Sequence, residues 1–224
     1  EAASATSAVG DLSPPLTLAD AAAAEDAPAE VPLSGCAAQL MRRVLMVLPH
    51  NFTLWHPHAI SQWNMLRKTI EDLGVQVLSL DQQWKLPSMV FVNRAGLVHK
   101  DKVYLSRFVD KERSRDQKYY RKWFAENSYT AFGEYYPLKF EGGGDAVFSD
   151  PKFLWAGCSD RIDVKVFDKI DKLGNFEVIR CDLVRNEFRH LDTCFAPLDE
   201  VSALWYPPAF SKNTQDEILR RLPQ

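Results

Sequence analysis

The residues best suited to chemistry lie in two short segments of the chain. Glu141 and Asp145 flank three consecutive glycines, and His190 opens the sequence His-Leu-Asp-Thr-Cys. A glycine run lets the backbone turn sharply and lets a ligand approach closely. Two carboxylates that face one space suit a cationic substrate, and histidine can carry a proton near neutral pH. Carboxylate and histidine supply part of a catalytic site, and a nucleophile would complete it.

The elements around these segments follow an α/β pattern. Continuous apolar runs predict strands, and apolar residues at helical spacing followed by glycine predict helices. The expected strands cover 43–49, 75–80, 89–92, 97–98, 102–105, 153–156, 177–183, 189–195 and 201–206, and the expected helices cover 59–73, 111–126, 163–173 and 213–222. A strand–strand–helix–strand unit therefore recurs about four times, which is typical of an α/β domain built from repeated modules.

Composition excludes several classes of protein and ligand. A net charge of −3 without a block of Lys or Arg argues against a nucleic-acid partner. No apolar run is long enough to predict a transmembrane segment. The three glycines are not followed by Lys-Ser/Thr, so they do not predict a phosphate loop, and we expect no cofactor. His56 and His58 lie two apart, but no second cluster completes a metal site, so we expect none. The four cysteines lack C-x-x-C spacing, which favours buried free thiols.

Five motifs taken together resemble the guanidine-modifying (pentein) superfamily. The resemblance is greatest to its amidinotransferase and dimethylarginine dimethylaminohydrolase-like branch. The motifs occur in the family's order and cover 91–98, 141–145, 156–161, 190–198 and 206–210. The resemblance implies a propeller of ββαβ modules over residues 41–224. This propeller is expected to be incomplete, with about four of five modules.

The resemblance also implies roles for individual residues. Glu141 matches the family's catalytic carboxylate, and His190 matches its general acid/base. The positions that match family contacts to substrate are Asn93, Arg107, Asp145, Arg161 and Asp192. In such enzymes a cysteine thiolate, placed well beyond the position of residue 224, attacks the guanidinium carbon. Cys194 and Cys158 are poor substitutes: on a continuous strand Cys194 would lie about 13 Å from His190, and nothing around Cys158 marks an activated thiolate.

Two arginines leave alternatives open. Arg94 departs from the family pattern, and a cation there has the wrong sign for a guanidinium substrate. The other interpretation, an arginine turned outward to solvent, is equally consistent with the sequence. Arg113 matches a family arginine that binds the substrate carboxylate, but the charged sequence around it favours a solvated helix face.

The first 40 residues are expected to form an extended, low-complexity leader. They are rich in Ala, Pro, Ser and acidic residues, and such a composition buries too little apolar area to fold alone. We expect the leader to contact other protein subunits. Because the chain begins with Glu1 and its thiols suit a reducing compartment, we expect a mitochondrial location, with plastid or cytoplasm as alternatives.

Three functions are compatible with these features. The first hypothesis is a catalytically inactive relative of the amidinotransferases that serves as a structural or accessory subunit of a larger complex. Its partners would contact residues 1–40 and an open C-terminal flank. The alternative is a guanidine or ureido hydrolase, or an amidinotransferase, acting on arginine-like substrates, with the cysteine module on a partner chain or absent from this sequence. The third is a sensor that binds an arginine-like small molecule without turnover.

Overall fold

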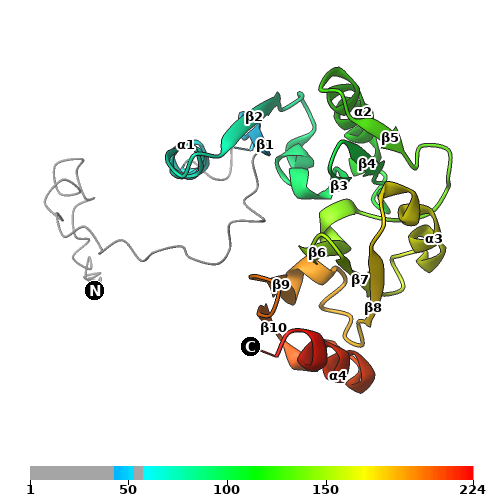
Figure 1. The fold of residues 1–224 in the computed structure, drawn as a ribbon. Helices are drawn as coiled ribbons and strands as arrows, with labels where there is room; N and C mark the ends of the chain where they lie inside the picture. Colours follow the sequence, from blue (N-terminus) through cyan, green and yellow to red (C-terminus); the bar gives the residue numbers. More distant parts are fainter. Residues whose placement is uncertain (1–42, 53–57, 224) are drawn as a thin grey trace, which may run out of the picture. The chain divides into compact units, whose positions relative to one another are not determined.

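The computed structural model describes residues 43–52 and 58–223 and has an α/β fold (Figure 1). The predicted leader, residues 1–40, lies outside the described residues, so its boundary and contacts stay a prediction. Among the described residues, none of the helices combines the length and the apolar character needed to span a bilayer.

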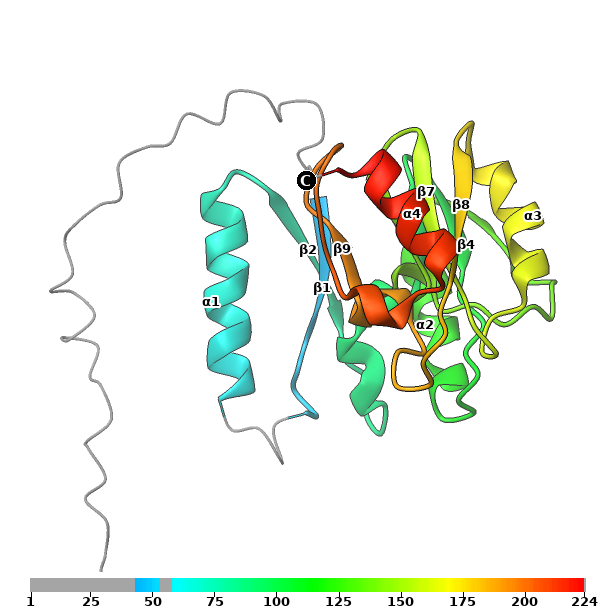
Figure 2. The ribbon, with the colours of Figure 1, turned by 90° about the horizontal axis from the view of Figure 1, so that it is seen from below.

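The first unit is a parallel pair of strands joined by a helix. β1 (Arg43–Leu48) pairs with β2 (Gln76–Asp81), and α1 (Ala59–Asp72) connects them and lies beside β2 (Figure 2). The predicted helix is confirmed, but none of its side chains is buried. Met65 remains 67% exposed and Leu66 54% exposed. The helix is therefore amphipathic in sequence without being enclosed by the described part of the chain.

Two complete strand–strand–helix–strand modules follow. In each, the first two strands form an antiparallel pair and the last strand joins the second in parallel. The second module contains β3 (Gly96–His99), β4 (Lys102–Leu105), α2 (Gln117–Glu126) and β5 (Thr130–Phe132); the third contains β6 (Ala146–Asp150), β7 (Phe153–Cys158), α3 (Phe167–Ile170) and β8 (Glu177–Asp182). The repeat predicted from the sequence is thus present, and two of the four expected units are complete among the described residues.

The last unit contains an antiparallel pair, β9 (Phe195–Pro197) with β10 (Ala203–Trp205), and then α4 (Lys212–Arg221). The side chain of Ser211 accepts a hydrogen bond from the backbone N–H of Thr214 and caps α4. The helix thus begins earlier than the sequence predicted. Ser211 has the extended backbone that an N-cap requires.

Two predicted strands are wrong, and both errors lie next to the site. Residues 89–92 cover the end of one 3-10 turn, Pro87–Val90, and the start of another, Val92–Arg94, with Phe91 between them. Pro87 at the start of the first turn has no backbone N–H, so it suits a turn better than a central strand. In the second case a 3-10 turn (Leu191–Thr193) precedes β9, so residues 189–195 are not one strand.

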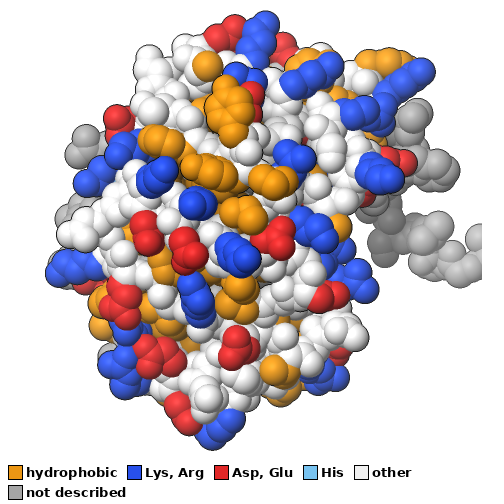
Figure 3. Space-filling view, turned by 90° about the vertical axis from the view of Figure 1, so that its right-hand side faces the viewer, with side chains coloured by type: hydrophobic (Ala, Val, Ile, Leu, Met, Phe, Trp, Pro, Cys, Tyr) orange, Lys and Arg blue, Asp and Glu red, His pale blue; other side chains and the backbone are white. Residues whose placement is uncertain are grey.

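Apolar side chains hold these units together in three clusters. Tyr120, Trp123 and Phe124 of α2 are buried against β4 and β1, and Phe167 and Ile170 of α3 are buried against β6 and β7. The third cluster joins β7 and β8 to β9 and α4. On the face shown in Figure 3, Lys and Arg alternate with Asp and Glu rather than forming a patch of one sign.

Candidate functional site

The glycine run places Glu141 against the second module. Residues 142–144 form a 3-10 turn, and Gly142 has a φ of +54°. A Cβ atom at Gly142 would lie 2.7 Å from the backbone of Gly96, at the start of β3. Only glycine fits both this conformation and this close approach. The turn therefore packs directly on β3 and buries Glu141 and Asp145 at its two ends.

A buried aspartate orients His190. The Nδ1 atom of His190 lies 2.7 Å from Oδ1 of Asp145, and Oδ2 of Asp145 accepts a hydrogen bond from the backbone N–H of Glu141. Burial raises the pKa of Asp145, and the hydrogen bond and charge of His190 offset part of that rise. The other ring nitrogen, Nε2, lies 3.8 Å from Oε2 of Glu141. Asp145 thus holds the imidazole by Nδ1, and Nε2 faces Glu141.

Three arginines surround the carboxylate of Glu141. Its Oε1 lies 3.7 Å from Arg161 Nη2, and its Oε2 lies 3.9 Å from Arg113 Nη1 and 4.0 Å from Arg94 Nη1. The backbone N–H of Val109 donates a hydrogen bond of 3.3 Å to Oε1. The three cations stabilise the buried charge, but all lie beyond normal hydrogen-bond distance. Among the described residues no donor bonds Oε2, so this oxygen can accept an N–H from a ligand.

The interpretation of Arg113 as a solvated helix residue is wrong. The residue is buried, and its guanidinium lies 4.3 Å from the ring centroid of Phe108 and 3.5 Å from Asp116. Residues 113–115 form a separate 3-10 turn before α2, so the helical face predicted from 111–126 does not apply to them. Burial raises the pKa of Asp116, and the positive charge of Arg113 opposes that effect.

Arg94 points into the site instead of outward to solvent. Its Nη2 lies 3.1 and 3.2 Å from the two carboxylate oxygens of Asp192. The side-chain amide of Asn93 donates a further hydrogen bond of 3.1 Å to Asp192. The structure therefore joins the 3-10 turn at 92–94 to the 3-10 turn at 191–193, at the rim of the site.

Arg107 stands apart from the other site candidates. It is exposed, and its backbone pairs with Phe140, the residue before Glu141. Within the described part of the chain, no ion pair or hydrogen bond joins its side chain to the carboxylates of the site. Sequence reasoning missed the contributions of Val109, Phe108 and Asp116, because a backbone N–H, a ring that packs on Arg113 and a carboxylate that pairs with Arg113 carry no motif.

The described cysteines do not provide an activated nucleophile. Cys158, Cys181 and Cys194 are free thiols. Burial raises the pKa of all three, to about 11 for Cys194, so they are protonated at neutral pH. Cys36 lies outside the described residues. The prediction of buried thiols holds for Cys181 and Cys194, whereas Cys158 is half-buried.

The fold and this site define an α/β protein of the guanidine-modifying type, and comparisons with known proteins agree. The family described as "N,N dimethylarginine dimethylhydrolase, eukaryotic" matches residues 50–224, so the chain belongs to that family. Three relatives show the range of similarity. Protein ZK1307.1 of Caenorhabditis elegans is 51% identical to this chain. The alignment covers 84% of this chain and 71% of that protein. The bifunctional arginine dihydrolase/ornithine cyclodeaminase ArgZ of Synechocystis is 40% identical over 74% of this chain. The N(G),N(G)-dimethylarginine dimethylaminohydrolase of Mycobacterium tuberculosis is 30% identical over 74% of this chain.

Solved structures confirm the predicted fold. The N-terminal domain of ArgZ, solved with substrate bound to a cysteine-to-serine mutant, superposes with a TM-score of 0.74 at 35% identity and covers 81% of this chain and 72% of that one. A dimethylarginine dimethylaminohydrolase at 17% identity and a TM-score of 0.63 shares the fold. The chain spans 23% of the length of ArgZ and 54% of the M. tuberculosis enzyme. The protein is thus related to arginine-modifying enzymes and has the pentein-like fold that the motifs indicated.

Proposed function

We propose that this protein is a hydrolase that acts on the guanidino group of arginine-like substrates. The observation that carries the proposal is the buried Asp145–His190 pair, whose free nitrogen faces Glu141 at 3.8 Å. The carboxylate can bind a guanidinium, and the oriented imidazole beside it can transfer a proton to or from a group attached to the guanidinium carbon. The relatives named as arginine dihydrolase and dimethylarginine dimethylaminohydrolase support this class of substrate.

The reaction assigns a separate task to each side chain. Glu141 Oε2 accepts an N–H of the guanidinium, which is always charged. A thiolate adds to the central carbon, and the resulting C–N bond cleavage requires a proton on the leaving amine. His190 Nε2 donates that proton and then takes one from the water that hydrolyses the thioether-linked intermediate. The amine or ammonia leaves before this water adds. Collapse of the water adduct breaks the C–S bond, which restores the thiolate and releases a ureido product, and the remaining proton passes to the released amine while His190 stays an imidazolium.

The thiolate must come from outside the described residues. The three described cysteines are held as thiols, so they do not suit the attack. The use of a cysteine-to-serine mutant to observe substrate in ArgZ supports a cysteine nucleophile in the related site. We therefore place the nucleophile on a segment that the described residues do not include.

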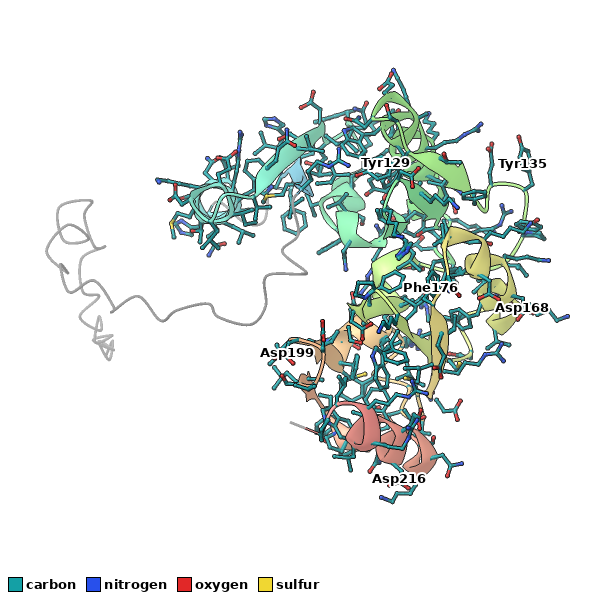
Figure 4. All side chains as sticks on the ribbon, viewed as in Figure 1. Tyr129, Tyr135, Asp168, Phe176, Asp199 and Asp216 are labelled. Atoms are coloured by element: carbon teal, nitrogen blue, oxygen red, sulfur yellow. The ribbon has the colours of Figure 1, made fainter. Side chains whose placement is uncertain are left out.

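Ligand binding tests the proposal independently of the nucleophile. Isothermal titration with L-arginine and with N,N-dimethyl-L-arginine should show binding that Glu141→Gln weakens at least tenfold, because a charge-assisted hydrogen bond contributes about 1.5–3 kcal/mol. The matched control is Asp168→Asn. Asp168 is an exposed acid on α3 that projects from the outer side of the helix in Figure 4. Equal affinities for the wild type and Glu141→Gln would refute the role of Glu141.

A second candidate function is a catalytically inactive accessory subunit of a protein complex. The ion pair between Arg94 and Asp192 favours it, because it places a cation at the rim where a cationic substrate would enter. Exposed Leu198 and Leu204 on the β9–β10 unit would suit a covering partner. Native mass spectrometry that shows a stable multi-subunit particle, with no arginine turnover, would support this function over hydrolysis. The mitochondrial location stays a prediction.

A further inference from the structure

We propose that Arg94 is a tethered guanidinium that competes with cationic substrates for the carboxylates of the site, and thereby determines which ligands bind. The inference rests on the proposed function, because it concerns guanidinium binding beside Glu141. Arg94 Nη2 contacts both oxygens of Asp192, and Nη1 lies 4.0 Å from Glu141 Oε2. The side chain thus presents to these two acids the same chemical group that an arginine-like substrate carries.

The glycine run provides the space that this side chain occupies. A Cβ atom at Gly144 would lie 3.0 Å from Arg94 Nε and 3.2 Å from its Cγ. The aliphatic stem of Arg94 therefore packs on the third glycine of the turn that carries Glu141. Asn93 donates a hydrogen bond to Oδ2 of the same carboxylate and helps to hold it in place. The position of Arg94 follows from these packed neighbours and not from chance placement of a surface side chain.

Electrostatics make Arg94 a competitor. Glu141 can accept an N–H at Oε2 but already faces Arg113 and Arg161, so the second acid that an incoming cation could pair with, at the rim, is Asp192. Arg94 holds that acid. A guanidinium ligand must therefore displace the Arg94 guanidinium or bind with an unpaired positive charge in a largely buried site. A neutral ligand of the same shape avoids that cost.

Of the three arginines, Arg94 is the one that is accessible and also pairs with the acid at the rim. Its side chain is 23% exposed, whereas that of Arg113 is 10% exposed and lies against Phe108. Arg161 is equally exposed, but its ion pair, at 3.7 Å, is with Glu141, whereas Arg94 pairs with Asp192 at the rim. We therefore assign ligand selection by charge to Arg94 and not to the other two arginines.

The test compares a charged ligand with its neutral ureido counterpart. Arg94→Met keeps the aliphatic stem over Gly144 and removes the charge. In titration calorimetry with the 224-residue chain, this variant should bind L-arginine about tenfold more tightly than the wild type, because one charge-assisted contact no longer has to be displaced. Its affinity for L-citrulline should change by less than about twofold. Arg94→Lys keeps the charge with fewer donors and should show a smaller gain.

The control removes an equal charge elsewhere. Arg180 forms an exposed ion pair of 3.4 Å with Asp168, and Arg180→Met should leave both affinities unchanged. Weaker binding of L-arginine to Arg94→Met would mean that Arg94 holds the substrate, and it would overturn the inference, as would an unchanged affinity. Thermal unfolding of each variant shows whether it is folded. If the wild type and all variants fail to bind either ligand, the proposed function fails together with the inference. Equal binding by the wild type and Arg94→Met refutes the inference alone.

Discussion

Asp145→Asn should change the tautomer of neutral His190, with the ring proton moving from Nδ1 to Nε2. In the wild type, the carboxylate accepts hydrogen bonds from Glu141 N–H at one oxygen and from His190 Nδ1–H at the other. In the variant, the amide oxygen must stay opposite the fixed backbone N–H of Glu141. The amide NH2 group then faces Nδ1, which must become an acceptor, so the ring proton moves to Nε2. The nitrogen that faces Glu141 would then be protonated in the neutral ring and could no longer accept a proton from water.

The cost of this change follows from the two hydrogen bonds. Each bond to an ionised acceptor is worth about 1.5–3 kcal/mol, and each becomes a neutral bond worth about 1 kcal/mol. The amide also removes the desolvation cost of a buried carboxylate, which offsets part of the loss. We expect the free energy of unfolding at pH 7 to fall by about 2 kcal/mol. In an enzyme with its nucleophile in place, turnover should fall by a factor of about 10²–10⁴, the usual contribution of general acid–base catalysis.

Long-range ¹H–¹⁵N correlation spectra of the histidine rings measure the tautomer directly and need no turnover. Signals of His190 can be assigned with His190→Gln, and urea denaturation gives the stability. Asp199→Asn is the control. Asp199 accepts backbone hydrogen bonds at the turn between β9 and β10 and is marked in Figure 4. It should not affect the His190 signals. If Nδ1 remains protonated in Asp145→Asn, the hydrogen-bond assignment at this site is wrong.

Two further predictions concern stability. Gly142→Ala should lower the free energy of unfolding by more than about 3 kcal/mol, because a positive φ and a 2.7 Å approach to backbone both oppose a Cβ; Gly74→Ala, also at positive φ but with no atom within 4 Å, should cost only about 1 kcal/mol in the same urea titration. Hydrogen bonds from Arg220 and Arg221 lower the pKa of Glu217 to about 2. Its stabilisation is therefore complete above the unfolded value of about 4.3 and is lost as the pH falls toward 2. Glu217→Gln should be less stable than the wild type by up to about 1 kcal/mol at pH 6, because the ion pairs of Glu217 with the two arginines lie near the surface. This difference in stability should shrink at pH 3. A difference that grows at low pH would contradict this assignment.

Elements with a strong local pattern could be predicted from the sequence. The hairpin of β3 and β4 and the helical segments of 59–73 and 213–222 follow from apolar spacing and turn residues, and the structure contains each of them with shifted ends. The carboxylates Glu141 and Asp145 could be grouped because three glycines between them imply one sharp turn. These are contacts between neighbours in the chain, for which local sequence carries the information.

The role of the arginines could not be predicted in the same way. Arg113 lies in a charged segment whose overall pattern indicates a solvated helix, and a 3-10 turn of three residues is enough to redirect it toward Phe108. The sequence offered no signal for that turn. Similarly, the apolar residues of 89–92 have the composition of a strand, but Pro87 and the burial of Met89 beneath Tyr120, which donates a hydrogen bond to the Met89 carbonyl, favour turns.

Arg94 shows why the sign of one side chain's charge is a poor guide to what a binding site accepts. From sequence, a cation near the expected carboxylates argued against any guanidinium ligand, or else had to point away. In the structure, the carboxylate of Asp192, which lies 98 residues later in the chain, pairs with Arg94 and neutralises its charge. Once Asp192 is included, Arg94 no longer adds an unbalanced charge; it fills a place that a ligand guanidinium could take in exchange. The same residue is therefore compatible with binding and with self-inhibition, and the affinity for L-arginine relative to L-citrulline, with and without the Arg94 guanidinium, distinguishes the two.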